Sequence, residues 1–127
     1  MTALLRLAAI YSLGWAIALA HPAWLPYTVG VPSPEMRALA HGLAIANLVL
    51  AYLCYRAAGD PGGERGIVYG AMLLFGLRGL IGTYEVLYLL DGPAAVLRLI
   101  DMVLSLALFV GMLNALPAPP PRNGPVS

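Results

Sequence analysis

Four ionisable residues interrupt two long apolar segments of this chain. Arg78 and Glu85 lie in one segment, and Arg98 and Asp101 lie in the next. Guanidinium groups bind carboxylates and phosphates through paired hydrogen bonds, and carboxylates neutralise them. A charge at the centre of a bilayer costs about 2.5–3.5 kcal/mol, so such residues face the protein interior and mark candidate functional sites. We expect these two cations and two anions to form one neutral polar cluster.

The turn between the two segments predicts which of these side chains meet. Helices on either side of Asp91-Gly92-Pro93 run back along each other, which brings Glu85 and Arg98 to the same depth. Arg78 and Glu85 are seven positions apart and share a helix face, as do Arg98 and Asp101 at a spacing of three. The predicted order in depth is Glu85 with Arg98, then Asp101, then Arg78. This cluster is either a structural ion-pair network or a ligand site.

His41, in an earlier apolar segment, is expected at a similar depth. Its imidazole could be an axial ligand of haem or of a bacteriochlorophyll, or a hydrogen-bonded structural residue. A proton relay through His41, Glu85 and Asp101 is disfavoured, because two arginines beside the carboxylates keep them ionised. Arg78 and Arg98 could instead hold an anionic head group. The sequence therefore specifies no cofactor.

Other kinds of chemistry find no support in the sequence. There is no nucleophile and base pair, phosphate-binding glycine loop or metal motif of recognised spacing. Cys54 is the single cysteine, which excludes an internal disulfide. The formal net charge of +1 offers no basic surface for nucleic acid. These features favour a protein that is not an enzyme.

Composition and hydrophobic pattern predict the elements that position the cluster. The chain has 127 residues, of which 61% are hydrophobic and only 10% charged, a composition typical of membrane proteins. Apolar segments predict helices at 2–20, 34–56, 66–90 and 94–116, each long enough to cross a bilayer. The predicted fold is all-α, an antiparallel bundle of four transmembrane helices with short loops. Residues 1–116 form the domain, and 117–127 form a proline-rich tail.

The first two segments carry signals at their ends. Residues 1–20 also resemble a secretory signal peptide, but we expect a retained helix, because three further spans would gain from a fourth partner. The following loop contains Trp24 and Tyr27, which suit a membrane interface. Ser33 is a candidate N-cap, with Pro34 at the first helical position.

Small residues predict close helix contacts within the membrane. The second helix carries a stripe of small or polar residues at three-four spacing, and the third carries glycines that begin with a GxxxG pattern. The stripe consists of Ala40, Ala44, Asn47, Ala51 and Cys54, and the glycines are Gly66, Gly70, Gly76, Gly79 and Gly82. Both surfaces are predicted to pack against helices.

Arginine positions predict the orientation. Arg6, Arg56, Arg65 and Arg122 lie on the side of both termini, and Arg37 lies on the opposite side. By the positive-inside rule both termini are cytoplasmic, in a bacterial inner membrane. The polar cluster then lies in the outer half of the bilayer.

Several segments suggest a family resemblance. They are the Trp24-Leu25-Pro26 loop, Phe75-Gly76-Leu77-Arg78-Gly79-Leu80 and Leu89-Leu90-Asp91-Gly92-Pro93. Together they resemble small bacterial four-helix integral membrane protein families of unknown function, up to about Leu116. The resemblance implies the fold and brings no activity.

Two functions are open at this point. The first is a non-catalytic accessory or structural subunit that packs against other membrane proteins or against copies of itself. The alternative is a binding or transport protein that holds a lipid, quinone or pigment in an outer-leaflet pocket. A subunit would have closed ion pairs and small-residue faces buried against partners. A binding protein would have an open cavity at Arg78 and Arg98.

Overall fold

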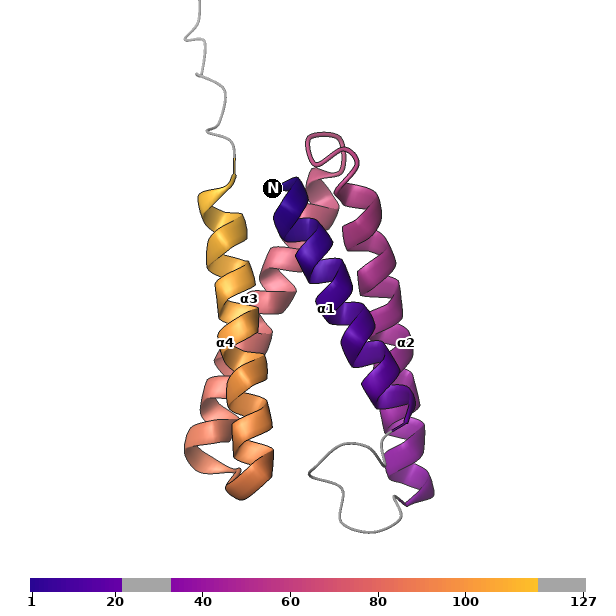
Figure 1. Cartoon of the computed structure of the whole chain (residues 1–127), viewed down its shortest axis with the longest axis vertical. Helices are drawn as coiled ribbons and strands as arrows, with labels where there is room; N and C mark the ends of the chain where they lie inside the picture. Colours follow the sequence, from indigo (N-terminus) through magenta and orange to yellow (C-terminus); the bar gives the residue numbers. More distant parts are fainter. Residues whose placement is uncertain (22–32, 117–127) are drawn as a thin grey trace, which may run out of the picture.

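The computed structural model describes residues 1–21 and 33–116, which form four α-helices and, within these ranges, no β-strand. The helices are α1 (Thr2–Ala20), α2 (Pro34–Ala57), α3 (Arg65–Tyr88) and α4 (Gly92–Asn114) (Figure 1). All four are long and apolar enough to cross a membrane, as predicted. The expectations for Trp24, Tyr27 and the tail at 117–127 lie outside the described residues.

Local signals set the start of α2 and the helix ends at the turn between α3 and α4. The Ser33 hydroxyl accepts a hydrogen bond from the backbone N–H of Met36 at 3.1 Å, so Ser33 is the N-cap of α2. Helix α3 ends at Tyr88, before the predicted Leu90, because the N–H groups of Leu89 and Leu90 both donate to the Glu85 carbonyl at 2.9 Å. Gly92 has a φ of +59°, which glycine adopts without strain, and α4 begins there rather than at residue 94.

The helices are arranged as two pairs. Helix α1 packs mainly on α2, and α3 mainly on α4, with fewer contacts between the pairs. In Figure 1 the two pairs lie close together at the end that carries the N-terminus and spread apart toward the other end. We call these the converged end and the open end.

Three glycines of α3 make its contact with α4. Gly76, Gly79 and Gly82 are buried, and a Cβ on them would meet Phe109, Leu106 and Met102, respectively. At Gly79 that Cβ would stand 2.4 Å from Leu106 Cδ2. The partners run in the opposite order along α4.

The predicted packing role does not extend to the first two glycines of α3 within this chain. Gly66 and Gly70 are exposed, and among the described residues no atom beyond the chain neighbours and the adjacent backbone of the same helix lies within 4 Å of a Cβ built on either. Gly70 precedes Gly79 by nine residues, or about two and a half helical turns, and therefore lies on the opposite face of α3. The GxxxG pattern faces away from α4.

The stripe of small residues on α2 is the buried face of that helix. Ala40, Ala44, Asn47, Ala51 and Cys54 are all buried. Their short side chains let α1 approach closely, which fits the extensive contact between the two helices.

An apolar core fills the converged end and draws on all four helices. Phe75 and Leu5 are its largest fully buried apolar side chains, and Met112 of α4 is also fully buried. Around them pack alanines, Cys54, Val68 and Met72. The core contains no charged residue, and it fixes the two pairs to each other at this end.

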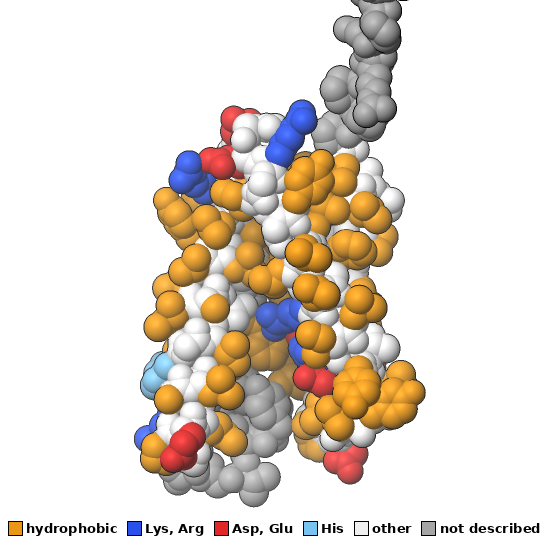
Figure 2. Space-filling view, turned by 180° about the vertical axis from the view of Figure 1, so that it is seen from behind, with side chains coloured by type: hydrophobic (Ala, Val, Ile, Leu, Met, Phe, Trp, Pro, Cys, Tyr) orange, Lys and Arg blue, Asp and Glu red, His pale blue; other side chains and the backbone are white. Residues whose placement is uncertain are grey.

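The outer surface suits a lipid environment. Large apolar side chains cover the outside of both pairs, as Figure 2 shows for one face. Exposed Tyr69 lies near the start of α3, and exposed Tyr84 and Tyr88 lie near its end. Tyr69 and Tyr88 are 19 positions apart, or about 28 Å along the helix, close to the thickness of a hydrocarbon core of about 30 Å. Tyrosines at both boundaries match aromatic belts.

Candidate functional site

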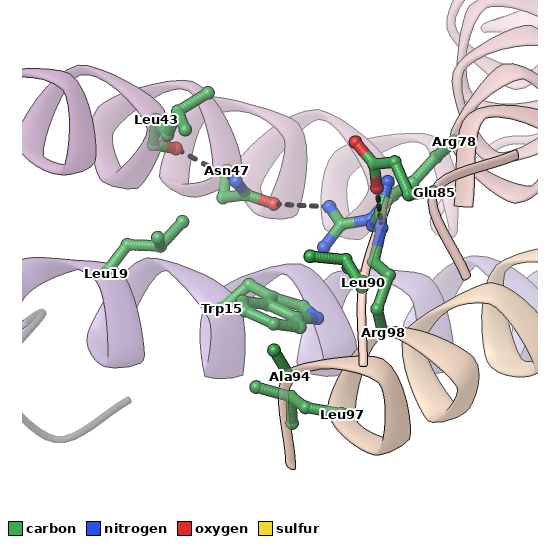
Figure 3. Close-up of a pocket in the computed structure, with 10 residues that line it drawn as sticks. All are labelled: Trp15, Leu19, Leu43, Asn47, Arg78, Glu85, Leu90, Ala94, Leu97 and Arg98. Carbon is green, nitrogen blue, oxygen red and sulfur yellow. Dashed lines mark hydrogen bonds and ion pairs between the residues drawn. The ribbon is translucent and has the colours of Figure 1, made fainter. Parts of the chain in front are cut away.

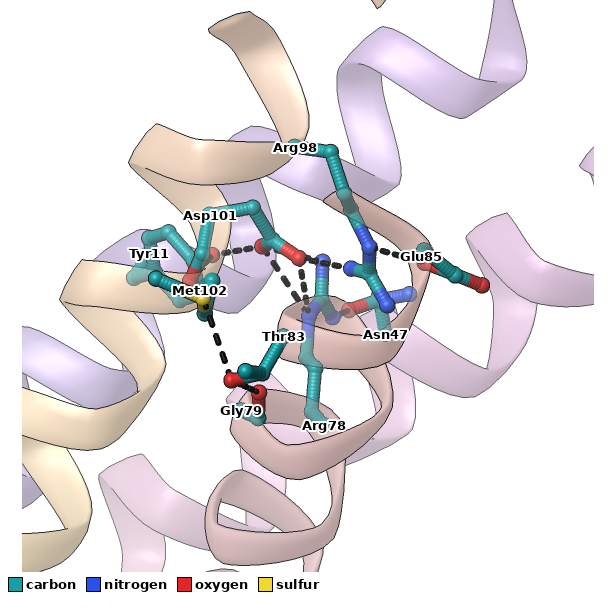
Figure 4. Close-up of polar contacts among 9 residues, drawn as sticks. All are labelled: Tyr11, Asn47, Arg78, Gly79, Thr83, Glu85, Arg98, Asp101 and Met102. Atoms are coloured by element: carbon teal, nitrogen blue, oxygen red, sulfur yellow. Dashed lines mark hydrogen bonds and ion pairs between the residues drawn. The ribbon is translucent and has the colours of Figure 1, made fainter. Parts of the chain in front are cut away.

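A buried carboxylate, Asp101 of α4, is the centre of the polar cluster. Its side chain has no solvent exposure. Arg78 of α3 binds both of its oxygens: Nε lies 3.0 and 3.1 Å from Oδ1 and Oδ2, and Nη2 lies 2.8 Å from Oδ1. The Tyr11 hydroxyl of α1 and Nη1 of Arg98 also donate to this carboxylate (Figure 4). Asp101 thus joins three helices through charge-assisted hydrogen bonds.

The cluster continues in two directions from Asp101. Arg98 donates through Nε to Glu85 of α3, the pair predicted from the turn. Arg78 donates through Nη1 to Oδ1 of Asn47 on α2 at 3.3 Å. The Asn47 amide in turn donates to the Leu43 carbonyl at 2.9 Å, which orients its oxygen toward Arg78. All four helices therefore contribute to one network.

Aromatic rings of α1 cover the Arg78 guanidinium. Its Cζ lies 5.5 Å from the ring centroid of Tyr11 and 5.0 Å from that of Trp15. Both distances are within the range of cation–π attraction. Tyr11 also contacts Phe75 of the converged core, with ring centroids 6.1 Å apart. Helix α1 thus connects the polar cluster to the apolar core.

A cavity of about 630 Å³ lies beside the cluster, between the two helix pairs (Figure 3). Its walls are largely apolar, and its polar lining comes from the cluster. The apolar lining residues are Trp15, Leu19, Leu43, Leu90, Ala94 and Leu97, and the polar ones are Asn47, Arg78, Glu85 and Arg98. Figure 2 shows charged side chains inside the hollow between the pairs. The volume is within the range of about 300–1,000 Å³ found for small-molecule sites.

Arg98 has unused hydrogen-bonding capacity on this cavity. Its Nε donates to Glu85 and its Nη1 donates to Asp101. Its Nη2 carries two further N–H donors, for which the described residues supply no acceptor. Arg98 lines the cavity and its side chain is 21% exposed, so its guanidinium group can be reached from the cavity. The site therefore offers cationic donors to an acceptor group inside apolar walls.

The structure brings together four of the five charged or titratable candidates. Glu85, Arg98, Asp101 and Arg78 form one chain of contacts in that order. His41 lies apart: it is exposed and is not among the described residues that line the cavity. Since it directly follows Ala40 of the buried stripe, it is rotated from that face by about 100°. The predicted depth of His41 in the membrane did not predict on which side of α2 it lies.

Tyr11, Trp15 and Asn47 were not identified as site residues from the sequence. A signal did exist, because Tyr11 and Asn47 are polar residues near the middle of apolar helices. Such groups need a partner inside the membrane, which points to the bundle interior. Among the described residues no group of three or more His, Cys, Asp or Glu side chains is placed to hold a metal ion.

Comparisons of the chain with protein-family models, with curated proteins and with solved structures gave no match. The resemblance to small four-helix membrane families thus stays a prediction from a few sequence positions. The chemistry of the site has to be argued from its own residues.

Proposed function

We propose that the chain is an integral protein of the bacterial inner membrane, with four antiparallel helices and both termini in the cytoplasm. The apolar outer surface and the two tyrosine zones support membrane insertion. Exposed Arg6, Arg56 and Arg65 near the converged end support the orientation, with that end in the cytoplasm. Helix α1 is retained in this proposal, because it supplies Tyr11 and Trp15 to the polar cluster.

Within that membrane the protein binds a lipid-soluble ligand. The observation that carries this proposal is the partly exposed Arg98 guanidinium, which lines a cavity of about 630 Å³ with largely apolar walls. The polar head of the ligand accepts hydrogen bonds from this arginine, and its apolar part lies against Trp15, Leu19 and Leu97. A lipid, a quinone or a pigment has this amphiphilic character. The ion pairs of the cluster serve to hold the arginines in place.

A second candidate function rests on a different surface. Gly66 and Gly70 leave the start of α3 without side chains on an exposed face, where another helix could approach closely. This favours an accessory subunit that packs against a membrane protein or against a copy of itself. The two functions use opposite parts of the molecule and are compatible with each other.

Native mass spectrometry with an absorption spectrum, on protein extracted gently from its own membrane, tests both functions. Ligand binding predicts a bound small molecule that is lost in Arg98→Gln and kept in Arg65→Gln, which removes an exposed arginine outside the cavity. Subunits that co-purify without any small molecule would contradict ligand binding as the main role and favour the accessory function.

A further inference from the structure

We propose that the head group of the ligand is a carboxylate, and that Glu85 occupies its position while the cavity is empty. This inference rests on the proposed binding function and assigns its chemistry. On binding, the ligand carboxylate replaces that of Glu85 at Arg98, and Glu85 turns toward the membrane surface. Glu85 is then an exchangeable counter-ion, whereas Asp101 is a permanent one.

The surroundings of the two carboxylates are unequal. The Asp101 side chain has no exposure and accepts hydrogen bonds from Tyr11, Arg78 and Arg98. The Glu85 side chain is 32% exposed, and its only hydrogen-bond partner among the described residues is Arg98. Breaking one accessible ion pair frees Glu85, and Arg98 keeps its contact with Asp101. The guanidinium therefore stays in position during the exchange.

The Glu85 carboxylate can also reach water at low energetic cost. It is in the last turn of α3, beside exposed Tyr84 and in the same turn as exposed Tyr88. Tyrosines of this kind mark the membrane interface, so a side-chain rotation carries the Glu85 carboxylate to water. A carboxylate buried deeper in the membrane could not leave in this way, because its charge would enter hydrocarbon.

Charge balance selects the head group. Arg78, Arg98, Glu85 and Asp101 sum to zero. An anion that binds without displacing Glu85 would add a net negative charge within the membrane, whereas an anion that replaces Glu85 leaves the cavity neutral. A neutral alcohol or ester would leave Glu85 in place and gain only the hydrogen bonds of Nη2. A single-chain amphiphile with a carboxylate head fits both the charge and the apolar walls.

Equilibrium binding to the full chain in nanodiscs tests this exchange. The probes are myristate, myristyl alcohol, methyl myristate and a lysophosphatidic acid of the same chain length. We expect myristate to bind more tightly than the alcohol and the ester. Glu85→Gln removes the competing carboxylate and should raise the affinity for myristate about tenfold or more, with little change for the alcohol. Asp91→Asn is the matched control, because Asp91 is an exposed acid at the same end that makes no capping hydrogen bond.

A second measurement uses the unmodified protein and does not depend on the folding of a variant at Glu85. The chain has three glutamates, Glu35, Glu64 and Glu85, so labelling with ¹³Cδ-glutamate gives three signals. Glu35→Gln and Glu64→Gln identify the Glu85 signal by elimination. Myristate should shift this signal toward that of a solvated carboxylate, and the alcohol should not.

The outcomes separate the two proposals. If none of the four probes binds while protein from its own membrane carries a small molecule that Arg98→Gln loses, the carboxylate inference is wrong and the binding function stands. If that protein carries no small molecule either, the binding function itself is wrong. If the alcohol binds as tightly as myristate, or if Glu85 stays unmoved with myristate bound, the exchange is wrong while ligand binding stands. Tighter binding of lysophosphatidic acid than of myristate would overturn the assignment of a carboxylate head group.

Discussion

The two ends of the molecule hold their helices together by different forces. At the converged end, Phe75, Leu5 and Met112 pack with alanines and other apolar side chains, and the buried core there contains no charged residue. At the open end, the helix pairs are apart, and the connection between them runs through Asn47, Arg78 and the rings of α1. Close packing of apolar side chains holds the converged end together, whereas polar contacts connect the separated helix pairs at the open end.

This difference reflects the solvent. Lipid tails are as apolar as leucine, so helices in a bilayer gain little from burying apolar side chains and associate through close packing and polar contacts. The converged end needs complementary shapes, which its alanines and aromatic rings supply. The polar network of the open end does not require close packing, and a cavity can exist beside it. Four experiments would break or sharpen this comparison.

The largest effect is expected from Asp101→Ala. Removing this carboxylate leaves two guanidinium groups with one remaining counter-ion, and breaking such a buried pair costs about 3–5 kcal/mol. Unfolding by SDS in mixed micelles, followed by circular dichroism, measures the loss of stability. Asp91→Ala is the control, since it removes an exposed acid outside the network. A loss below about 1 kcal/mol for Asp101→Ala would show that the network contributes little to stability.

Phe75→Ala should cost less than Asp101→Ala. In a water-soluble core this substitution costs about 3–5 kcal/mol, the sum of a transfer term and a cavity term. In the membrane the transfer term nearly disappears, and we expect a loss of about 2 kcal/mol from the cavity alone. Leu77→Ala, at an exposed position of the same helix, should change stability little. If Phe75→Ala costs more than Asp101→Ala in the same assay, the proposed contrast between the ends is wrong.

Two glycine substitutions on opposite faces of α3 should differ. Gly79→Ala places a methyl group against Leu106 and should cost about 1–2 kcal/mol, because α3 and α4 must separate. Gly70→Ala meets open space and should be neutral or slightly stabilising, since alanine favours helix. Equal effects in unfolding assays on the isolated chain would contradict the contact between α3 and α4. A loss of co-purifying protein in Gly70→Ala would instead support the accessory function.

Tyr11→Phe should have the smallest effect, about 1 kcal/mol, the typical net contribution of one hydrogen bond. The ring stays against Arg78 and Phe75, and Asp101 keeps both arginines as donors. Tyr52→Phe, at an exposed position, is the control for loss of a hydroxyl group. A loss as large as that of Asp101→Ala would mean that the Tyr11 hydroxyl, and not the stacking of the α1 rings on Arg78, is the main connection of α1 to the cluster.

The sequence was sufficient for features that depend on distance along a helix. Apolar length predicted four spans, Ser33 predicted a helix start, and the turn at Gly92 predicted that Glu85 and Arg98 pair. Each of these follows from fixed helical geometry. The end of α3 lies two residues before the predicted one, because the N–H groups of Leu89 and Leu90 donate to the Glu85 carbonyl. The start of α4 lies two residues before the predicted one, at Gly92.

Features that depend on which face meets which neighbour could not be predicted in the same way. A glycine pattern predicts the close approach of a helix without identifying that helix. The spacing puts Gly66 and Gly70 on the opposite face of α3 from Gly79, but it does not say which of the two faces packs on α4. The exposure of His41 could have been predicted, because the stripe of small residues on α2 had already identified the buried side of that helix. The contribution of α1 through Tyr11 and Trp15 depends on tertiary packing between the helix pairs, which the spacing of residues within one helix does not contain.

The placement of all four cluster charges on α3 and α4 has a consequence for synthesis. Each of these helices contributes one cation and one anion to the cluster, and the ion pairs Arg78–Asp101 and Glu85–Arg98 run between the two helices. Leaving the translocon alone, α3 would expose unpaired charges to lipid, whereas the hairpin of α3 and α4 would leave as a neutral unit. Photocrosslinking of nascent chains should then detect α3 beside the translocon until α4 has emerged from the ribosome. Release of α3 on its own would show that its charges find partners before α4 is made.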